Sequence, residues 1–155
     1  MADVKDLVKH LENLTQLDID AVHAYTSAIE HIDLPDVKQQ LTAFRSDHER
    51  HISNLSPFVE RMGGKVPTRT PDFKGFIIQG FTAVRSMLGN EGALKAMKGN
   101  EELTIKTYEK ALELEFPQDV KEVIQKNRDD ERRHLDYINR CLDQRVWERE
   151  KKTVA

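Results

Sequence analysis

Two short stretches decide the fold of this chain: residues 47–51 read DHERH, and residues 130–134 read DERRH. They lie 83 positions apart, and the same offset places residues 11–52 on residues 94–135. The matched positions include Asp18 with Glu101, Tyr25 with Tyr108, Asp47 with Asp130, His48 with Glu131, Arg50 with Arg133 and His51 with His134. Because an internal repeat sets the architecture before any local feature does, two similar units are predicted, each bringing matching polar residues to one place.

The apolar residues between these polar positions recur with helical spacing. In the first segment they fall at Leu7, Leu11, Leu14, Leu17, Ala21, Tyr25 and Ala28. Steps of three and four residues are typical of one face of an amphipathic helix, and three later segments follow the same rule. Nothing alternates with period two for long. The sequence therefore predicts an all-α chain with four long helices.

Short links and one long connection predict how these helices join. Links near residues 32–35 and 115–118 are short enough for antiparallel hairpins. The first hairpin should span about residues 4–62 and the second about residues 91–148, within a single domain of residues 1–155. The crossover of residues 63–90 is long enough to cross a bundle, and its apolar spacing predicts a short extra helix. The expected fold is a four-helix bundle built from two pseudo-symmetric hairpins.

Local signals mark the expected ends of the helices. Asp3 and Asn90 suit N-caps of the first and third helices, and Pro35 and Pro117 suit first-turn positions. The pair at residues 63–64 is Gly-Gly, which is typical of a helix C-terminus. The charge run at residues 145–152 suits the C-terminal end of the last helix dipole.

Composition excludes several classes of protein. The net charge is −3 with both signs interspersed, so no basic face for nucleic acid is predicted. No run of 18 apolar residues appears, which argues against a membrane span, and the polar first residues lack the apolar core of a secretory signal. Cys141 is the single cysteine, so no internal disulfide forms and a reducing cytoplasm is the expected location.

Six polar residues interrupt the apolar stripes, and these are the candidate metal ligands: Asp18, His48, His51, Glu101, Glu131 and His134. Asp18 and His48 each lie 15 positions from the centre of the first turn, near residue 33. Glu101 and Glu131 lie equally far from the second turn, so each pair should sit roughly 22 Å from its turn at a rise of about 1.5 Å per residue. Buried charge is costly unless it is paired or bound to metal. Convergence at one depth therefore predicts a buried metal site.

This arrangement resembles the ferritin-like di-metal carboxylate bundles, in which a carboxylate on one helix and Glu-x-x-His on the next occur twice. Within that superfamily the chain is most similar to small bacterial proteins of unassigned function. The resemblance implies that Asp18 and Glu101 are terminal carboxylates, that Glu131 is a bridging glutamate, and that His51 and His134 are nitrogen ligands. It also implies that Asp47 and Asp130 each bind the second nitrogen of a ligand histidine across the site.

His48 departs from the family pattern, which has a second bridging glutamate at this position, and Asp18 is one methylene shorter than the usual Glu. A neutral imidazole cannot bridge two metals as a carboxylate does. Three carboxylates also leave two divalent ions with one uncompensated positive charge, which disfavours diferric states, ferroxidase chemistry and iron storage. Imidazole-rich sites suit zinc, copper, nickel or iron.

The same residues also have interpretations that do not involve metal binding. An eroded ferritin-like scaffold could keep the six residues as a buried polar network. Tyr25 and Tyr108 fit either phenols near the metals or core aromatics with satisfied hydroxyls. Cys141 fits a small buried hydrophobe. The remaining polar candidates are expected at the surface or in solvent: His10, His23, His31, Asp20, Glu49 and Glu102.

The function expected from the sequence is binding of two transition-metal ions, with iron the first candidate and zinc or manganese as alternatives. If the chain is an enzyme, metal-dependent redox chemistry with dioxygen or peroxide is expected, without an assigned catalytic residue. The alternative is a non-catalytic helical scaffold or a stress or interaction protein. Metal ions are the expected partners, and a homodimer is expected rather than a large storage shell.

Overall fold

The computed structural model describes residues 3–70 and 89–153, with side chains described up to residue 149. In these ranges the chain forms five helices and no strand: α1 (Val4–Glu30), α2 (Pro35–Arg61), α4 (Gly89–Leu112), α5 (Gln118–Asp143) and α6 (Val146–Thr153). The prediction of an all-α chain with four long helices is therefore confirmed. The extra helix expected in the crossover falls on residues 71–88, outside the described residues.

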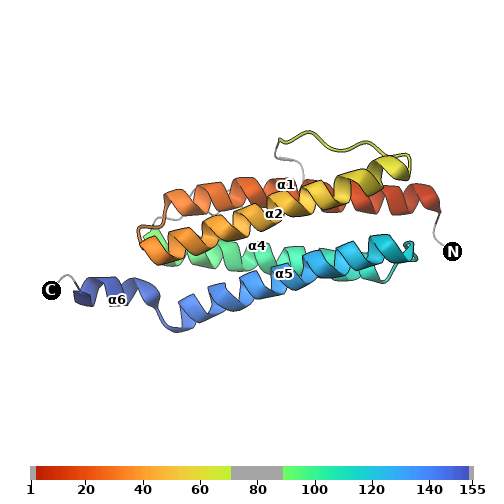
Figure 1. Cartoon of the computed structure of the whole chain (residues 1–155). Coiled ribbons are helices and arrows are strands. Elements are labelled where there is room, and N and C mark those ends of the chain that lie inside the picture. Colours follow the sequence, from red (N-terminus) through yellow and green to blue (C-terminus); the bar gives the residue numbers. More distant parts are fainter. Residues whose placement is uncertain (1–2, 71–88, 154–155) are drawn as a thin grey trace.

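The four long helices pair as two antiparallel hairpins that pack against each other (Figure 1). Helix α1 packs on α2 and α4, and α5 packs on α4 and α2. The end of α2 and the start of α4 lie at opposite ends of the bundle (Figure 1). This placement is what a bundle with one long crossover requires. No helix in the described ranges is long and apolar enough to cross a membrane.

The helix boundaries follow the sequence signals with three differences. Asp3 caps α1 by accepting a hydrogen bond from the Lys5 N–H at 3.4 Å, and Pro35 is the first residue of α2, both as predicted. Pro117 lies one position before α5, with an extended backbone (φ −54°, ψ 152°), rather than in its first turn.

Asn90 does not cap α4 but links that helix to the turn between α1 and α2. Its Oδ1 accepts from the Asp33 N–H at 2.9 Å, and its Nδ2 donates to Asp33 Oδ1 at 2.7 Å. The turn offers Asn90 a backbone donor and a carboxylate together, which gives its amide two partners from one residue. The prediction of an N-cap at Asn90 was therefore wrong, and the side chain ties the two hairpins together at this end.

The last predicted helix is broken in two. Helix α5 ends at Asp143, Arg145 adopts a left-handed conformation with φ 48°, and α6 starts at Val146. Val146 is buried and Trp147 packs against the same apolar cluster, so the bend lets the chain bury apolar residues that a straight helix would carry away from the core. The charge run therefore belongs to α6 and not to the end of the fourth helix.

Two glycines end α2, as the sequence predicted, each for a different reason. Gly63 has φ +88°, a conformation that favours glycine. A Cβ on Gly64 would lie 2.5 Å from Val8 Cγ1 and 3.0 Å from Val59 Cγ1, so any side chain there would collide with α1 and α2. The Gly64 N–H donates to the Val59 carbonyl at 2.8 Å, which gives the helix terminus a partner.

The returning segment after α2 lies along α1. The Lys65 N–H donates to Glu12 Oε2 at 2.8 Å, and Gln16 donates to the Thr70 carbonyl at 3.0 Å. Gln16 also donates to Asp20 Oδ1 at 2.9 Å. Asp20 is buried, so the expectation of a solvated carboxylate was wrong; Gln16 supplies it with a hydrogen bond and links it to the segment that covers this face of α1.

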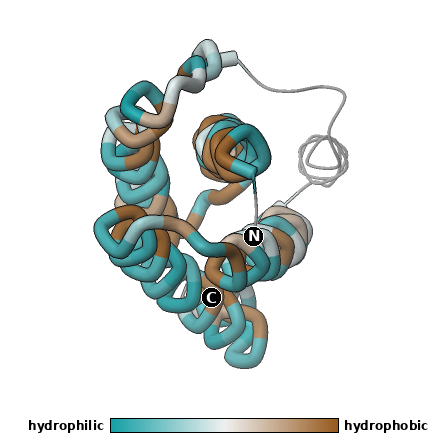
Figure 2. Tube along the Cα trace, turned by 90° about the vertical axis from the view of Figure 1, so that its right-hand side faces the viewer, coloured by the Kyte–Doolittle hydropathy of each residue, from teal (hydrophilic) through white to brown (hydrophobic). Residues whose placement is uncertain are grey.

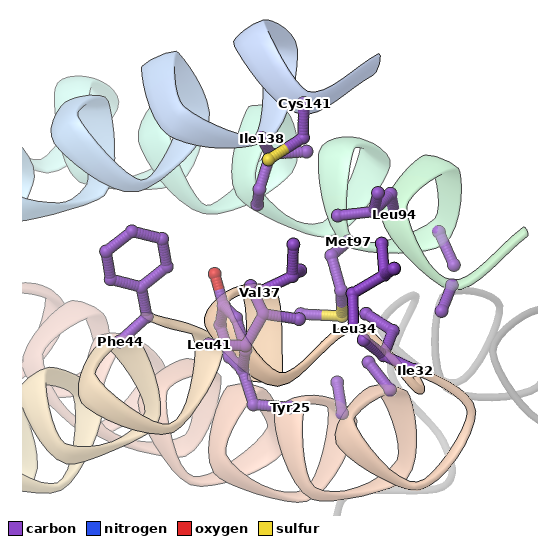
Figure 3. Close-up of a cluster of buried hydrophobic side chains, with 14 of the residues drawn as sticks. Tyr25, Ile32, Leu34, Val37, Leu41, Phe44, Leu94, Met97, Ile138 and Cys141 are labelled. Carbon is purple, nitrogen blue, oxygen red and sulfur yellow. The ribbon is translucent and has the colours of Figure 1, made fainter. Parts of the chain in front are cut away.

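The apolar core consists of two clusters along the bundle. Each long helix carries hydrophobic and hydrophilic strips, visible in the end view (Figure 2). The first cluster lies near the α1–α2 turn and includes Leu41, Met97 and Cys141, as Figure 3 shows. The second includes Leu11, Leu55 and other residues toward the α4–α5 turn. Cys141 is buried and free, as expected for a small core hydrophobe.

Candidate metal centre

Six polar side chains occupy the core between the two apolar clusters. They are the six predicted from the sequence: Asp18 on α1, His48 and His51 on α2, Glu101 on α4, and Glu131 and His134 on α5. Each of them has 0 % of its surface exposed. The structure therefore brings all six predicted candidates together.

The first group of donors draws on α1, α2 and α5. It consists of Asp18, His48, His51 and Glu131, each of which offers one ligand atom within 4.8 Å of the others. Asp18 Oδ1 lies 2.8 Å from His48 Nδ1 and 3.1 Å from His51 Nδ1. Glu131 Oε1 lies 3.1 Å from His51 Nδ1. Two carboxylates and two imidazoles thus face a common point.

The second group mirrors the first across the bundle. It consists of His48, Glu101, Glu131 and His134, again with all ligand atoms within 4.8 Å of one another. Glu101 Oε1 lies 3.2 Å from His48 Nε2 and 3.3 Å from His134 Nδ1. Glu131 Oε2 lies 3.3 Å from His48 Nε2 and 3.4 Å from His134 Nδ1. His48 and Glu131 therefore belong to both groups.

Outer carboxylates fix the orientation of two of the imidazoles. His51 Nε2 lies 2.9 Å from Asp130 Oδ2, and His134 Nε2 lies 2.8 Å from Asp47 Oδ2. A carboxylate accepts, so each Nε2–H donates outward, and each Nδ1 faces the donor groups. Each contact joins one hairpin to the other, as the sequence pattern predicted for Asp47 and Asp130. Such partners also raise the basicity of a ligand imidazole.

Two arginines hold the outer carboxylates in turn. Arg133 donates to Asp47 Oδ2 at 2.8 Å and to Asp130 Oδ1 at 3.1 Å. Arg50 donates to Asp47 Oδ1 at 3.1 Å and also to Asp130. Against the opposing effect of burial, hydrogen bonds from His51 and Arg133 lower the pKa of Asp130 to about 2. The pKa of Asp47 is likewise held well below its usual range by His134 and Arg133, despite burial.

Two tyrosines connect α1 and α4 reciprocally. The Tyr25 hydroxyl, on α1, donates to Glu101 Oε1 on α4, and the Tyr108 hydroxyl, on α4, donates to Asp18 Oδ2 on α1. Burial, followed by the nearby carboxylate charge, raises the pKa of both phenols well above the ordinary value. Both tyrosines are thus buried neutral donors to the candidate ligands, a role that includes the satisfied hydroxyls expected of core aromatics.

Proton positions in the metal-free cluster follow from its charges. Burial alone would lower the pKa of His48, but hydrogen bonds with Asp18 and Glu101 outweigh it and raise that pKa to about 10. Burial would raise the pKa of Asp18 and Glu101, yet their imidazole partners lower both. Burial and the charge of Glu101 raise the pKa of Glu131 well above its usual range. Without metal, His48 is therefore protonated near neutral pH, and loss of the proton from Glu131 is disfavoured.

The donor set fits a pair of metal ions because it leaves carboxylate oxygens without hydrogen-bond donors. Among the described residues, both oxygens of Glu131 and Oε2 of Glu101 are buried without a hydrogen-bond partner. Buried carboxylate oxygens without donors are costly. Oxygen and imidazole ligands at the same place are the ligands that first-row divalent metals prefer. The cluster thus has the composition of a metal-binding carboxylate and histidine site.

Sequence reasoning missed two neighbours of the site. The Phe44 ring stacks on His134, with ring centroids 4.1 Å apart, and Asn127 Nδ2 donates to the Tyr108 hydroxyl at 3.3 Å. Both residues occupy apolar stripes of their helices. A polar Asn127 one turn before Glu131 was the available signal. Phe44 carried none, because an aromatic residue on a stripe is ordinary core.

Comparison with known proteins identifies the family. The model of a domain of unknown function, DUF2383, matches residues 6–114, more than half of the chain. The chain belongs to this family. The matched region includes Asp18, His48, His51 and Glu101 and ends before α5. No curated protein matches the sequence.

A solved structure supports the fold independently. The crystal structure of a ferritin like, diiron-carboxylate protein from Bacillus anthracis str. Ames superimposes with a TM-score of 0.72. The similarity covers 92% of this chain and 99% of that one, at 23% sequence identity. The DUF2383 chain is thus a ferritin-like four-helix bundle, as the sequence resemblance implied.

Proposed function

We propose that this protein binds a pair of transition-metal ions in the bundle core. The proposed ligands are Asp18, His48, His51, Glu101, Glu131 and His134. The first ion would contact the donors shared by α1, α2 and α5, and the second those shared by α2, α4 and α5. Glu131, with one oxygen in each donor group, would contact both ions.

The observation that carries this proposal is the state of the Glu131 carboxylate. Both of its oxygens are fully buried, and neither receives a hydrogen bond from a described residue. A structural carboxylate in a helical core would be expected to accept at least one hydrogen bond. A carboxylate that contacts two cations instead satisfies each oxygen with one ion. The diiron-carboxylate description of the Bacillus anthracis neighbour agrees with this interpretation.

The residues around the ligands would support metal binding in distinct ways. Asp47 and Asp130 orient His134 and His51, so that Nδ1 of each ring faces the site. Tyr25 and Tyr108 hold Glu101 and Asp18 by one oxygen each. The two apolar clusters exclude bulk water from both ends of the site. Preorganised ligands of this kind fix the geometry and open positions of a bound metal.

Iron is the first candidate metal, and zinc or manganese are the alternatives. Bound iron would supply redox reactivity toward dioxygen or peroxide. The protein's own contribution would be to hold the ligands and to limit water access. Three carboxylates and three imidazoles favour divalent ions over the trivalent states that iron storage requires.

The first test is metal content per chain. Wild-type protein, purified metal-free and reconstituted anaerobically with Fe²⁺, Mn²⁺ or Zn²⁺, should hold two ions per chain by mass spectrometry. The His51→Ala/His134→Ala variant should hold none. A matched control is His10→Ala/His31→Ala, which also removes two imidazoles but leaves the site intact and should still hold two ions.

The result that contradicts the proposal is wild-type protein without bound metal under all three conditions. Equal metal content in the wild type and the His51→Ala/His134→Ala variant would also contradict it, because the bound metal would then lie elsewhere. Folding of the variant is checked by its helical circular dichroism. After aerobic iron loading, near-ultraviolet or visible charge-transfer bands should appear in the wild type alone.

The second candidate function is a scaffold without metal, and one observation favours it. His48 and His51 already pair with Asp18, and His134 pairs with Glu101, so much of the polar network is satisfied by protein alone. A scaffold would keep its melting temperature in chelator and remain colourless.

For either function, we expect the protein to be a dimer by size exclusion, rather than a large hollow shell. We expect a reducing cytoplasm as the location of the protein.

A further inference from the structure

His48 differs from the other two histidines of the site in the use of its ring nitrogens. His51 and His134 each direct Nδ1 to the donor groups and Nε2 to an outer carboxylate. His48 directs Nδ1 to Asp18 in the first group and Nε2 to Glu101 in the second. Among the described residues, every carboxylate that His48 contacts belongs to one of the two donor groups.

We propose that His48 bridges the two metal ions as an imidazolate, with Nδ1 on the first ion and Nε2 on the second. This inference rests on the proposed function and specifies the bridging ligand. A terminal histidine ligand normally donates its other N–H to an acceptor outside the metal's ligands. His48 has no such outer acceptor among the described residues, whereas His51 and His134 both do.

The spacing of the donor atoms fits one ion at each nitrogen. A tetrahedral ion with bonds of about 2.0–2.1 Å has ligand atoms about 3.3 Å apart. Around His48 Nε2, the distances to Glu101 Oε1 and Glu131 Oε2 are 3.2 and 3.3 Å. Glu101 Oε1 and Glu131 Oε2 lie 3.3 and 3.4 Å from His134 Nδ1. The second group thus has nearly this spacing already.

The first group needs a small expansion. Asp18 Oδ1 lies 2.8 Å from His48 Nδ1, and His51 Nδ1 lies 3.1 Å from both Asp18 Oδ1 and Glu131 Oε1. Shorter separations are expected where a proton, rather than a metal ion, now joins Asp18 to His48. If an ion replaced that proton, the distance between Asp18 Oδ1 and His48 Nδ1 would increase by a few tenths of an ångström, toward the ideal of about 3.3 Å.

The internal repeat gives the bridge a counterpart. His48 and Glu131 occupy matched positions of the two hairpins, and each spans the two donor groups. Glu131 places Oε1 beside His51 and Oε2 beside His134. An imidazolate at position 48 would therefore keep two bridging ligands in the site, one from each hairpin, although one is a ring and the other a carboxylate.

The charges of the site also favour this form of His48. Two divalent ions carry four positive charges, and Asp18, Glu101 and Glu131 supply three negative ones. An imidazolate supplies the fourth, which makes the buried site neutral and avoids the cost of an unpaired charge. His48, protonated on both nitrogens in the metal-free protein, gives up one proton from Nδ1 and one from Nε2 as the two ions bind, and both protons pass to solvent. No oxidation or reduction accompanies this step.

The first experiment is a crystal structure of the Zn²⁺-loaded protein with anomalous diffraction at the zinc edge. Two peaks should lie on either side of the His48 ring, roughly 6 Å apart, since two metal–nitrogen bonds of about 2 Å flank the ring. Pairs that are bridged by carboxylates alone, without an imidazolate between the ions, are closer, at about 3.5–4 Å. Peaks at this shorter distance, with His48 on one ion or on none, would overturn the bridge and leave the proposed function standing. A single peak would also overturn the bridge.

The second experiment uses Cu²⁺ as a probe in solution. Two Cu²⁺ ions joined by imidazolate should be exchange-coupled, with a half-field signal in electron paramagnetic resonance and intensity lost on cooling to liquid-helium temperature. His48→Gln should abolish the coupling and give a spectrum of uncoupled Cu²⁺. The matched control, Glu131→Gln, removes the carboxylate bridge and should keep the coupling of any chains that hold two ions.

The variant His48→Glu tests whether loss of coupling in His48→Gln is due to misfolding. It gives position 48 the same residue type as Glu131, its matched position in the second hairpin. This variant should still bind two ions, with the metal–metal distance shortened toward the carboxylate-bridged value of about 3.5–4 Å. Coupling that survives in His48→Gln but disappears in Glu131→Gln would assign the bridge to Glu131 and overturn the proposal. If neither the wild type nor any variant bound metal in the mass-spectrometric test of metal content, the proposed function itself would be contradicted.

Discussion

The two hairpins of the bundle use the same scaffold with different chemistry at two matched positions. The first hairpin supplies Asp18 and His48 where the second supplies Glu101 and Glu131. The surrounding contacts are otherwise reciprocal: each hairpin's outer carboxylate binds the other's histidine, and each tyrosine binds the other's carboxylate. The repeat has therefore kept the positions of the site and the partners that orient its ligands, but not the ligand types.

His48 and Glu131, at matched positions of the two hairpins, differ less in their affinity for protons than their residue types suggest. In the metal-free protein, the pKa of both side chains is raised: hydrogen bonds raise that of His48 against burial, and burial raises that of Glu131. Both contact the two donor groups. Proton binding is thus favoured at both matched positions of the two hairpins.

The largest expected effects come from removing the carboxylates of the two donor groups one at a time. Glu131→Gln should weaken both ions, because Glu131 contributes to both donor groups, and should hold two only at saturating metal. Asp18→Asn and Glu101→Gln should each lose one ion and keep the other. We expect affinity at the lost position to fall by more than about 100-fold, beyond the range for outer partners of a metal site. Metal stoichiometry by mass spectrometry at limiting free metal gives two ions for the wild type, fewer than two for Glu131→Gln and one for each of the others.

These three variants are isosteric, so each keeps the packing of the core while it removes one negative charge. If Asp18→Asn and Glu101→Gln both lost two ions, the two donor groups would form one inseparable site rather than two halves. If Glu131→Gln kept two ions at wild-type affinity, Glu131 would not contact both ions.

A second prediction concerns pH and the metal-free protein. The folded-state pKa of His48 is raised from 6.5 to about 10, so its contribution to stability is fully present below pH 6.5 and is lost as pH rises through about 10. Glu131, with a raised pKa, acts in the same direction. The free energy of unfolding should therefore fall by a few kcal/mol over this interval, since one pKa unit is worth about 1.4 kcal/mol.

Urea denaturation in chelator at a series of pH values between 6.5 and 9 measures this effect. His48→Gln should flatten the dependence, because an amide does not titrate, and Glu131→Gln should reduce it. A wild-type midpoint that stays constant or increases over this range would show that His48 is already neutral in the folded protein.

The outer carboxylates allow a third, selective test. Asp130→Asn should weaken the ion beside His51, and Asp47→Asn the ion beside His134, each by about 10- to 100-fold, as is usual for outer partners of metal-bound histidines. The two single variants are matched controls for each other. Titration with Zn²⁺ in the presence of a competing chelator should resolve one weakened and one unchanged affinity. Equal weakening of both ions in either variant would indicate that Arg50 and Arg133, which contact both carboxylates, couple the two halves.

The sequence predicted the fold and the composition of the site because both depend on spacing. Matched depth from the two turns placed Asp18, His48, Glu101 and Glu131 at one level, and i,i+3 spacing added His51 and its repeat partner. The cross-hairpin contacts of Asp47 and Asp130 were implied by the resemblance to the ferritin-like bundles. Features of this kind are periodic, so a linear pattern records them.

Features that depend on local competition for hydrogen bonds were not predictable. Asn90 had the signature of a helix cap, yet a nearby turn offered it a better pair of partners at Asp33. Asp20 lay off the apolar stripe, yet Gln16 gave it a hydrogen bond under the returning segment. The direction of the His48 nitrogens was equally hidden, because the residue type does not specify which atoms of a ring face which neighbours.

The smallest expected effect distinguishes the two tyrosines. Among the described residues, Asp18 Oδ2 receives its hydrogen bond from Tyr108, which also accepts one from Asn127. Glu101 Oε1 contacts Tyr25 but also lies 3.2 Å from His48 and 3.3 Å from His134. Tyr108→Phe should therefore destabilise the metal-free protein by about 1–3 kcal/mol, the cost of leaving buried polar groups unsatisfied.

Tyr25→Phe should cost less, since two imidazoles still contact the same oxygen of Glu101. Urea denaturation of the two variants in chelator measures the difference, and each variant is the control for the loss of a hydroxyl from a fully buried ring. An equal cost for both, or a larger cost for Tyr25→Phe, would mean that His48 does not donate to Glu101. The proton of His48 would then face Asp18 alone, and the two donor groups would already differ before any metal binds.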